Sequence, residues 1–153
     1  MKNVNNRELG RQGERIAREY LHDKCGYEII ESNYYASHKE IDIIALDGEY
    51  IVFIEVKCRT KTKAPEKHRP AKAVGYRKRL NIVYAANSFI AENYGEDFVR
   101  GRASRIDVVE VLVPPMDVRY SDDSGELKLS ACSINHIRNA FYFSPENGRK
   151  IKS

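Results

Sequence analysis

Two carboxylates and a lysine lie inside neighbouring apolar segments of this chain. Asp42 lies in segment 40–46, and Glu55 and Lys57 lie in segment 50–57. Charged groups within strand-like apolar segments are costly unless they are paired or bind a metal. Two acids beside an amine suit a divalent cation and the water that it activates. The alternative is a solvated cross-strand ion pair between Glu55 and Lys57, which would carry no chemistry.

The turn between the two segments decides whether these side chains meet. Residues 47–48, Asp-Gly, are a strong signal for a two-residue hairpin loop. With that loop Asp42 lies opposite Phe53, and with a four-residue loop it lies opposite Glu55. Opposed residues share a sheet face, and so do residues two apart on one strand. In either register Asp42, Glu55 and Lys57 are therefore predicted to project from one face.

Length and composition indicate one domain. The chain has 153 residues, of which 42% are hydrophobic, enough for a single core. It has no apolar run long enough to span a membrane, and its polar start lacks the apolar centre of a signal peptide. We therefore expect a cytoplasmic protein with no membrane partner. The three cysteines are widely spaced and predict neither a disulfide framework nor a zinc site.

Positive charge is concentrated in one stretch of the sequence. Segment 57–79 holds ten Lys and Arg and one acid, a net charge of +9, so the rest of the +4 chain sums to −5. A basic stretch that begins at the candidate site suits a polyanion such as nucleic acid. The alternative is a solvated loop followed by an ordinary polar helix face.

A first helix is predicted over residues 7–22, with Gly26 just past its end as a C-cap. Gly10 and Gly13 lie inside this helix, where each costs about 1 kcal/mol relative to alanine. Close approach of another backbone or of a phosphate would explain them. Glu14 directly follows Gly13, and considered alone it is an exposed helix glutamate.

The remaining pattern predicts a mixed sheet with helices on its faces, an α/β fold. A right-handed crossover through the second helix would bring a later strand parallel to an earlier one. The predicted elements are strands 27–35, 40–46 and 50–57, a basic loop 58–69, a helix 71–93, a strand 105–113, a loop 119–126, a short edge strand 127–131, and a short helix or irregular segment 134–143.

The order of these residues resembles the PD-(D/E)XK nuclease superfamily. Glu14 on a first helix, Asp42 on a strand and residues 55–57, Glu-Val-Lys, on the next strand are its ordered signature. The fuller pattern resembles the YraN-type family, which is similar to archaeal Holliday-junction resolvases. Its matching pieces are Gly10 to Glu14, Asn33, Glu40 to Asp42, Phe53 to Arg59, Arg105 to Val109 and Ile134 to Phe141.

This resemblance implies a restriction-endonuclease-like mixed sheet flanked by helices. Residues 1–147 would form one nuclease-like domain, and 148–153 a basic tail that we expect to be disordered. The chain departs from the family at Lys39, where glycine is usual, and this leaves the role of Glu40 open. It also has Ile41 where the superfamily name implies proline.

The implied activity is metal-dependent hydrolysis of phosphodiester bonds in DNA. Asp42, Glu55 and the backbone carbonyl of Val56 would hold Mg²⁺ or Mn²⁺. Lys57 would stabilise the attacking water and the transition state, and Glu14 would be a further catalytic residue. The residues that we expect to bind the nucleic acid backbone are Arg59, Lys61, Lys63, Lys72 and Lys78.

Three functions remain open at this point. The first is a structure-selective endonuclease for branched or junction DNA, which the resemblance implies would act as a homodimer. The second is a non-catalytic nucleic-acid-binding protein that keeps the nuclease fold. The third is a phosphate- or nucleotide-handling enzyme that reuses the carboxylates. Cleavage in Mg²⁺ or Mn²⁺ that disappears in Asp42→Ala separates the first from the others.

Overall fold

The computed structural model describes residues 6–61, 74–95, 103–115, 126–143 and 151–152. Two α-helices, a short 3₁₀ helix and six strands occur in these residues. In chain order they are α1 (Asn6–Asp23), β1 (Glu28–Ala36), β2 (Lys39–Asp47), β3 (Tyr50–Thr60), α2 (Tyr76–Asn93), β4 (Ala103–Val113), η3 (Leu129–Ala131), β5 (Ser133–Phe143) and β6 (Ile151–Lys152).

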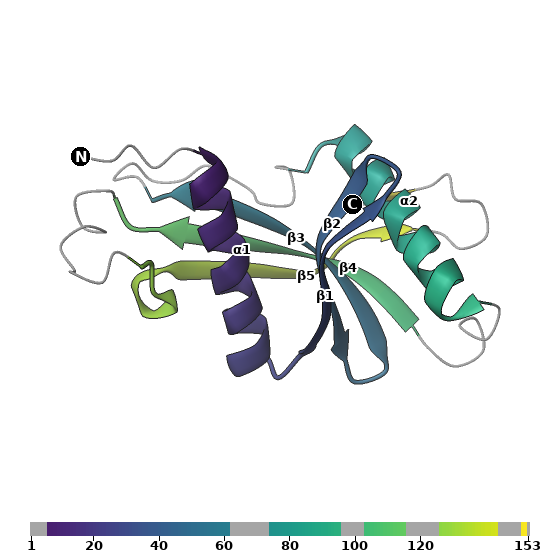
Figure 1. The fold of residues 1–153 in the computed structure, drawn as a ribbon, viewed down its shortest axis with the longest axis horizontal. Coiled ribbons are helices and arrows are strands. Elements are labelled where there is room, and N and C mark those ends of the chain that lie inside the picture. Colours follow the sequence, from purple (N-terminus) through teal and green to yellow (C-terminus); the bar gives the residue numbers. More distant parts are fainter. Residues whose placement is uncertain (1–5, 62–73, 96–102, 116–125, 144–150, 153) are drawn as a thin grey trace.

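The strands follow one another in space as they do along the chain, in the order β1-β2-β3-β4-β5-β6. Only β3 and β4 pair in parallel, and the other described pairs are antiparallel. The parallel pair is joined by the segment that contains α2, the crossover predicted from the sequence. Figure 1 shows the twisted sheet with α1 and α2 packed on it. The α/β prediction is confirmed, and the architecture is compatible with a restriction-endonuclease-like fold.

The two helices cover opposite faces of the sheet. On β2, Ile43 packs in the cluster beneath α1, whereas Ile44 packs in the cluster beneath α2. On β3, Ile54 packs in the cluster beneath α1 and Phe53 in the cluster beneath α2. The central strands are therefore apolar on both sides, which is why segments 40–46 and 50–57 have near-continuous hydrophobic runs.

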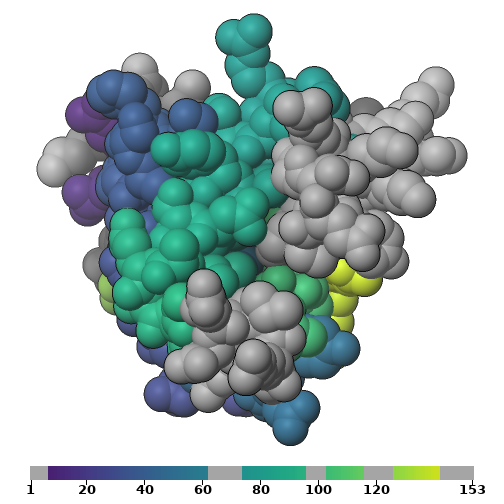
Figure 2. All heavy atoms as spheres, turned by 90° about the vertical axis from the view of Figure 1, so that its right-hand side faces the viewer, coloured from purple at the N-terminus to yellow at the C-terminus, as the bar shows by residue number. Residues whose placement is uncertain are grey.

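Helix α2 lies against the β1–β2 hairpin. Figure 2 shows this side of the molecule, with α2 beside the hairpin. Phe89 of α2 packs edge-on against the rings of Tyr34 and Phe53, with ring centroids 5.2 and 6.0 Å apart. On the outside, the Lys39 ammonium lies over the Tyr84 ring, 4.3 Å from its centroid. Lys39 thus joins the hairpin to α2 by a cation–π contact.

The β2–β3 turn is shifted by one residue from the predicted loop. Asp47 pairs with Tyr50, so the two-residue loop is Gly48 and Glu49, and Gly48 takes the left-handed conformation with φ of +58°. Glycine adopts that conformation without steric penalty. The resulting register, Leu46 with Ile51, is the one that the four-residue alternative predicted.

Helix predictions were accurate at the N-terminus and less so for α2. The predicted helix 7–22 is confirmed as Asn6–Asp23, and Gly26 has φ of +72° as expected after a helix end. Helix α2 begins at Tyr76 after an extended Gly75, later than the predicted start at residue 71. Residue 71 itself lies outside the described residues.

Predictions near the C-terminus were partly wrong. Segment 134–143, expected to be helical or irregular, lies in strand β5, where backbone pairing with β4 overrides a weak helical spacing of apolar residues. Segment 127–131, expected to be a strand, contains η3 instead. Ile151–Lys152 of the predicted tail form β6, which pairs with the end of β5.

The described helices include none that is both long and apolar enough to cross a membrane. Cys25, Cys58 and Cys132 are each partly buried, and these three described cysteines form no disulfide.

Candidate metal centre

Asp42 lies where strands β2 and β3 separate. Their pairing runs from the turn as far as Ile43 and Ile54. Beyond that point the Asp42 Oδ2 atom, at 2.8 Å, accepts the hydrogen bond that the backbone N–H of Val56 donates. Ile41 packs beneath α2 whereas Ile43 packs beneath α1, so the strict alternation of faces breaks at Asp42. The carboxylate therefore lies within the opening between the strands.

Helix α1 brings Glu14 to this opening. Its position depends on Gly13, because a Cβ at that residue would lie 2.5 Å from the Cβ of Cys58 on β3. Only glycine permits this close approach of helix and strand. Carboxylate oxygens of Glu14, Glu40 and Asp42 all lie within 4.8 Å of one another. We call these three residues the acid cluster.

Asn33 on β1 orients two members of the acid cluster. With its amide nitrogen turned toward the acids, it donates hydrogen bonds to Glu14 Oε2 at 3.1 Å and to Glu40 Oε1 at 2.8 Å. Its backbone is left-handed, with φ of 54°, a conformation that asparagine tolerates better than most residues. Asn33 thus links β1, β2 and α1 around the acid cluster.

Glu55 is a buried carboxylate on the α2 side of this centre, with 3% of its surface exposed. Its Oε1 atom lies 3.5 Å from the Lys57 Nζ and 3.6 Å from the Lys78 Nζ of α2. Its Oε2 atom is buried and has no hydrogen-bond partner among the residues that the structure describes. A buried carboxylate oxygen left unsatisfied is unfavourable, so a ligand at this position would stabilise it.

The electrostatics of the centre favour protonation or a bound cation. Burial, the charge of Glu55 and that of Glu40 raise the pKa of Asp42 to about 7, against the opposing hydrogen bond from Val56. Burial and the charges of Asp42 and Glu40 raise the pKa of Glu14 to about 7. Like charges held this close cannot all ionise without compensation.

These carboxylates make a donor set for a hard divalent cation. Mg²⁺ and Mn²⁺ take oxygen ligands, and carboxylates on several elements hold them well. The acid cluster supplies such oxygens from Glu14, Glu40 and Asp42, and the unsatisfied Glu55 Oε2 supplies another near Asp42. The residues present therefore fit the group that the resemblance implied.

The structure brings most of the described predicted site residues together and leaves others apart. Glu14, Asp42, Glu55 and Lys57 come together, and Lys78 joins them through Glu55. Val56 contributes its N–H to Asp42. Lys61 is exposed just past the end of β3, and Lys63 and Lys72 lie outside the described residues.

Arg59 has a partner that the sequence did not predict. Its Nε and Nη2 atoms both donate to Glu110 Oε1 on β4, at 3.1 and 2.8 Å. Glu110 is buried, with 1% exposed. A buried carboxylate held this way needs its arginine, so at least two of the Arg59 donors serve the fold.

Sequence reasoning left two members of the centre without a role. Glu40 belongs to the acid cluster, and Asn33 holds it there. The signals were present, since Glu40 lies two residues before Asp42 and Asn33 is a matched position of the resemblance. Only the pairing of β1 with β2 shows that these positions meet.

A second buried polar group lies on β4 and β5. Asp107, fully buried, accepts hydrogen bonds from Arg105 Nε at 3.0 Å, from the Asn139 N–H at 2.9 Å and shares one with His136 Nε2 at 2.8 Å. The other His136 nitrogen lies 3.2 Å from the Tyr20 hydroxyl on α1. Both ring nitrogens of the buried His136 side chain therefore have partners.

Comparison with known proteins places the chain in a family. The model of the uncharacterised protein family UPF0102 matches residues 13–111. That span contains every member of the acid cluster together with Glu55 and Lys57.

Relatives match over almost the whole chain. A UPF0102 protein of Chlorobium chlorochromatii is 39% identical over 88% of this chain and 92% of its own length. One of Caldanaerobacter subterraneus is 38% identical over 92% of this chain and its own full length, and one of Chlorobium limicola is 40% identical over 88% and 92%. Their names state no activity. The YraN-type resemblance is confirmed, and the chain belongs to the UPF0102 family.

Proposed function

We propose that this protein hydrolyses phosphodiester bonds in DNA with Mg²⁺ or Mn²⁺, and that it acts on branched or otherwise structured DNA. The observation that carries the proposal is the acid cluster beside the buried, unsatisfied Glu55 oxygen. Carboxylates brought together from α1, β2 and β3 repel one another, and burial together with this repulsion raises the pKa of Glu14 and of Asp42. Such strain is typical of functional sites.

The acid cluster and Glu55 would hold the cation, and Asp42 is the member of the cluster next to Glu55. A bound divalent ion would lower the pKa of a bound water and neutralise charge on the phosphate. Asn33 keeps Glu14 and Glu40 oriented, and Val56 fixes Asp42. These contacts hold the carboxylates in place before any ligand arrives, which reduces the reorganisation needed on binding.

Lys57 would be the residue that acts on the reacting phosphate. Its ammonium lies 3.5 Å from Glu55 Oε1 with the side chain about one third exposed. It can therefore reach a ligand in the opening while it stays paired with Glu55. An ammonium there would favour the hydroxide form of an attacking water and the charge of the transition state.

Basic residues flank the opening on the β3–α2 side. Lys78 lies at the start of α2 and Lys61 just past β3, both reachable by solvent. Contacts of this kind bind the phosphate backbone and carry no base sequence information. The preference for branched DNA comes from the resemblance to junction resolvases, and so does a homodimeric assembly.

A second candidate function is DNA binding without cleavage. The observation that favours it is the double ion pair of Glu55, because Lys57 and Lys78 both lie against Oε1. Two ammonium groups there already neutralise a carboxylate that the cation would need. Under this alternative the centre would be a structural charge network.

The decisive experiment measures cleavage of labelled junctions, forks, flaps and linear duplex in Mg²⁺ and in Mn²⁺. Wild type is compared with Asp42→Asn, Glu55→Gln and Lys57→Ala, and with Glu28→Gln, an exposed carboxylate at the far end of β1. The proposal expects cleavage by wild type and Glu28→Gln and a loss of at least 100-fold in the other three, the usual scale for such groups.

Three other results would each decide against the proposal. Salt-sensitive binding of DNA with no cleavage in either metal supports the second candidate. Equal cleavage by wild type and Lys57→Ala would point to a contaminating nuclease. Hydrolysis of small phosphodiesters without affinity for DNA would instead support a nucleotide-handling enzyme.

A further inference from the structure

A hollow of about 490 Å³ lies beside the acid cluster on the α1 side. Glu14 and Asn33 form part of its wall, so it adjoins the candidate metal centre directly. Three arginines of α1, Arg11, Arg15 and Arg18, line it as well. Arg11 precedes Glu14 by three residues and Arg18 follows it by four, so both share one face of α1 with Glu14, whereas Arg15 is its direct neighbour in sequence.

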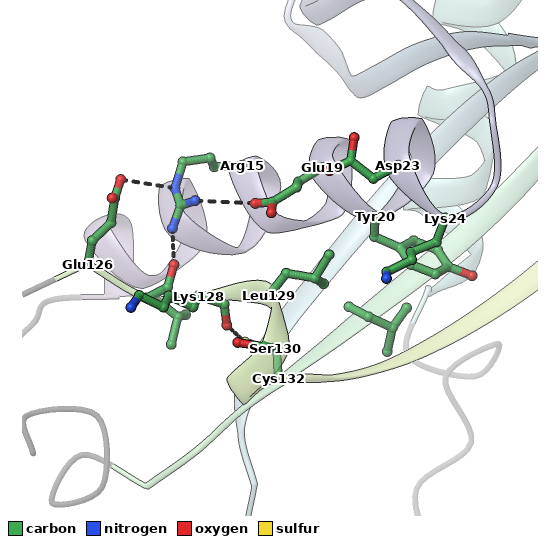
Figure 3. Close-up of a pocket in the computed structure, with 12 residues that line it drawn as sticks. Arg15, Glu19, Tyr20, Asp23, Lys24, Glu126, Lys128, Leu129, Ser130 and Cys132 are labelled. Carbon is green, nitrogen blue, oxygen red and sulfur yellow. Dashed lines mark hydrogen bonds and ion pairs between the residues drawn. The ribbon is translucent and has the colours of Figure 1, made fainter. Parts of the chain in front are cut away.

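Two of the three arginines are engaged within the protein. Arg11 pairs with Glu8 one turn earlier, at 3.3 Å. Arg15 makes more contacts, as Figure 3 shows: it pairs with Glu19 at 3.7 Å and Glu126 at 3.9 Å, and it donates a hydrogen bond to the Leu127 carbonyl. Arg15 therefore fastens α1 to the segment that leads into η3.

Arg18 differs from both. It follows Glu14 by four residues, the spacing at which helix ion pairs form, yet in the described part of the chain its guanidinium makes no ion pair or hydrogen bond. It acts on Glu14 only through its charge, which opposes the effect of burial on the Glu14 pKa. Its donors are left for a ligand in the hollow.

The balance of charge in the hollow depends on the metal. Arg11 and Arg15 are offset by their acidic partners Glu8 and Glu126, which also line it. Glu14 would repel an anion, but a divalent cation on the acid cluster would neutralise it. With the cation bound, Arg18 is the uncompensated charge of the hollow.

We propose that this hollow is a phosphate subsite, in which Arg18 binds a backbone phosphate of the DNA strand next to the phosphate that is cleaved. The inference rests on the proposed function and names a contact that the sequence did not suggest. A guanidinium binds a phosphate through two parallel hydrogen bonds, which a lysine cannot reproduce. A phosphate bound in this hollow would place the DNA strand across α1, on the side of the centre opposite to Lys78.

The test compares Arg18→Gln with Arg7→Gln, a matched loss of one charge at an exposed arginine of α1 that is not part of the hollow's wall. Cleavage of the best DNA substrate is measured in Mn²⁺ at several salt concentrations. We expect Arg18→Gln to raise KM roughly tenfold or more, the scale of a lost charge-assisted contact, with a smaller change in kcat. The slope of log KM against log salt concentration should be smaller for this variant than for wild type by about one, the value expected for one lost phosphate contact. Arg7→Gln should stay within about twofold of wild type.

Arg18→Lys and thermal melting keep the result interpretable. The lysine keeps the charge without the fork, so its KM should lie between those of wild type and Arg18→Gln. Equal effects of Arg18→Gln and Arg7→Gln would overturn the inference while leaving the nuclease activity intact. An Arg18→Gln defect that follows a matching fall in melting temperature would also overturn it. If wild type neither binds nor cuts any DNA, the proposed function itself fails.

Discussion

The backbone N–H of Val56 donates a hydrogen bond to the carboxylate of Asp42 at 2.8 Å, across the point where β2 and β3 part. This single contact replaces the strand pairing that ends one residue earlier. It fixes Asp42 between the two sheet faces that the helices cover, next to Glu55 and to the other two members of the acid cluster, Glu14 and Glu40. The geometry of the centre therefore follows from an interruption in the sheet.

Removing the charge of Asp42 should stabilise the metal-free protein. The pKa of Asp42 is raised to about 7 from 3.8, so its ionised form opposes folding at pH 8 and its protonated form does not at pH 5. Asp42→Asn keeps an oxygen that can accept the Val56 N–H. We expect the free energy of unfolding of the variant to exceed that of wild type by on the order of 2 kcal/mol at pH 8, with the difference shrinking by pH 5.

Urea unfolding with chelator present, at both pH values, measures this difference. Glu28→Gln, which changes an exposed acid, is the control and should leave the stability unchanged. A variant less stable than wild type at pH 8 would show that the Asp42 carboxylate stabilises the fold, contrary to the argument.

A divalent cation should stabilise wild type more at high pH than at low pH. Both Glu14 and Asp42 have pKa values raised to about 7, so protons compete with the metal below that value. We expect millimolar Mn²⁺ to raise the melting temperature clearly at pH 8 and little at pH 5.5. Asp42→Asn should lose most of this increase. An increase of the same size at both pH values would mean that Mn²⁺ binds elsewhere.

The sequence predicted which residues meet, but not how they meet. Asp42, Glu55 and Lys57 were placed together by strict alternation along two paired strands. In the structure the alternation breaks between Ile41 and Ile43, and Asp42 reaches its neighbours because the strands separate. A period of two is a property of continuous pairing, so a local departure from it leaves no signal in the residue pattern.

The two glycines of α1 should respond in opposite ways to substitution by alanine. A Cβ at Gly13 would lie 2.5 Å from Cys58 Cβ and 2.7 Å from its Sγ, whereas a Cβ at Gly10 has nothing within 4 Å. Gly10→Ala should therefore stabilise the protein by about 1 kcal/mol through helix propensity. Gly13→Ala should destabilise it by about 1–3 kcal/mol through overpacking, and it should displace Glu14 from the acid cluster.

Thermal unfolding of the two variants checks the stabilities, and the Mn²⁺-induced rise in melting temperature checks the position of Glu14. Gly10→Ala should keep that rise and Gly13→Ala should lose part of it. Equal stabilisation by both substitutions would show that α1 can move away from β3 at no penalty.

The C-terminal predictions failed because the deciding contacts are distant in sequence. Ile134, Ile137 and Phe141 have a spacing that fits a helix face, yet each is opposite a residue of β4 in the sheet. Strand β4 has an open edge once β3 has paired on its other side. Pairing at that edge outweighs a modest local preference, and no local pattern reports it.

The buried Asp107 should be a main source of acid sensitivity. Burial alone would raise its pKa, but hydrogen bonds from His136, Arg105 and the Asn139 N–H outweigh burial and lower it. An acid with a lowered pKa stabilises the fold above its ordinary value near 4, and that stability is lost as the pH falls through the native pKa. Asp107→Asn should cost about 3 kcal/mol at pH 7, because it removes the buried one of the two carboxylates that pair with Arg105 and leaves only Asp47.

The pH profile separates this charge network from simple packing. The stability of wild type should fall steeply between pH 5 and pH 3, whereas that of Asp107→Asn should change less over the same range. Asp23→Asn, an exposed acid at the end of α1, should follow the wild-type profile. If Asp107→Asn is as acid-sensitive as wild type, the loss at low pH comes from other carboxylates. Asp107 would then stabilise the join of β4 and β5 through its hydrogen bonds alone.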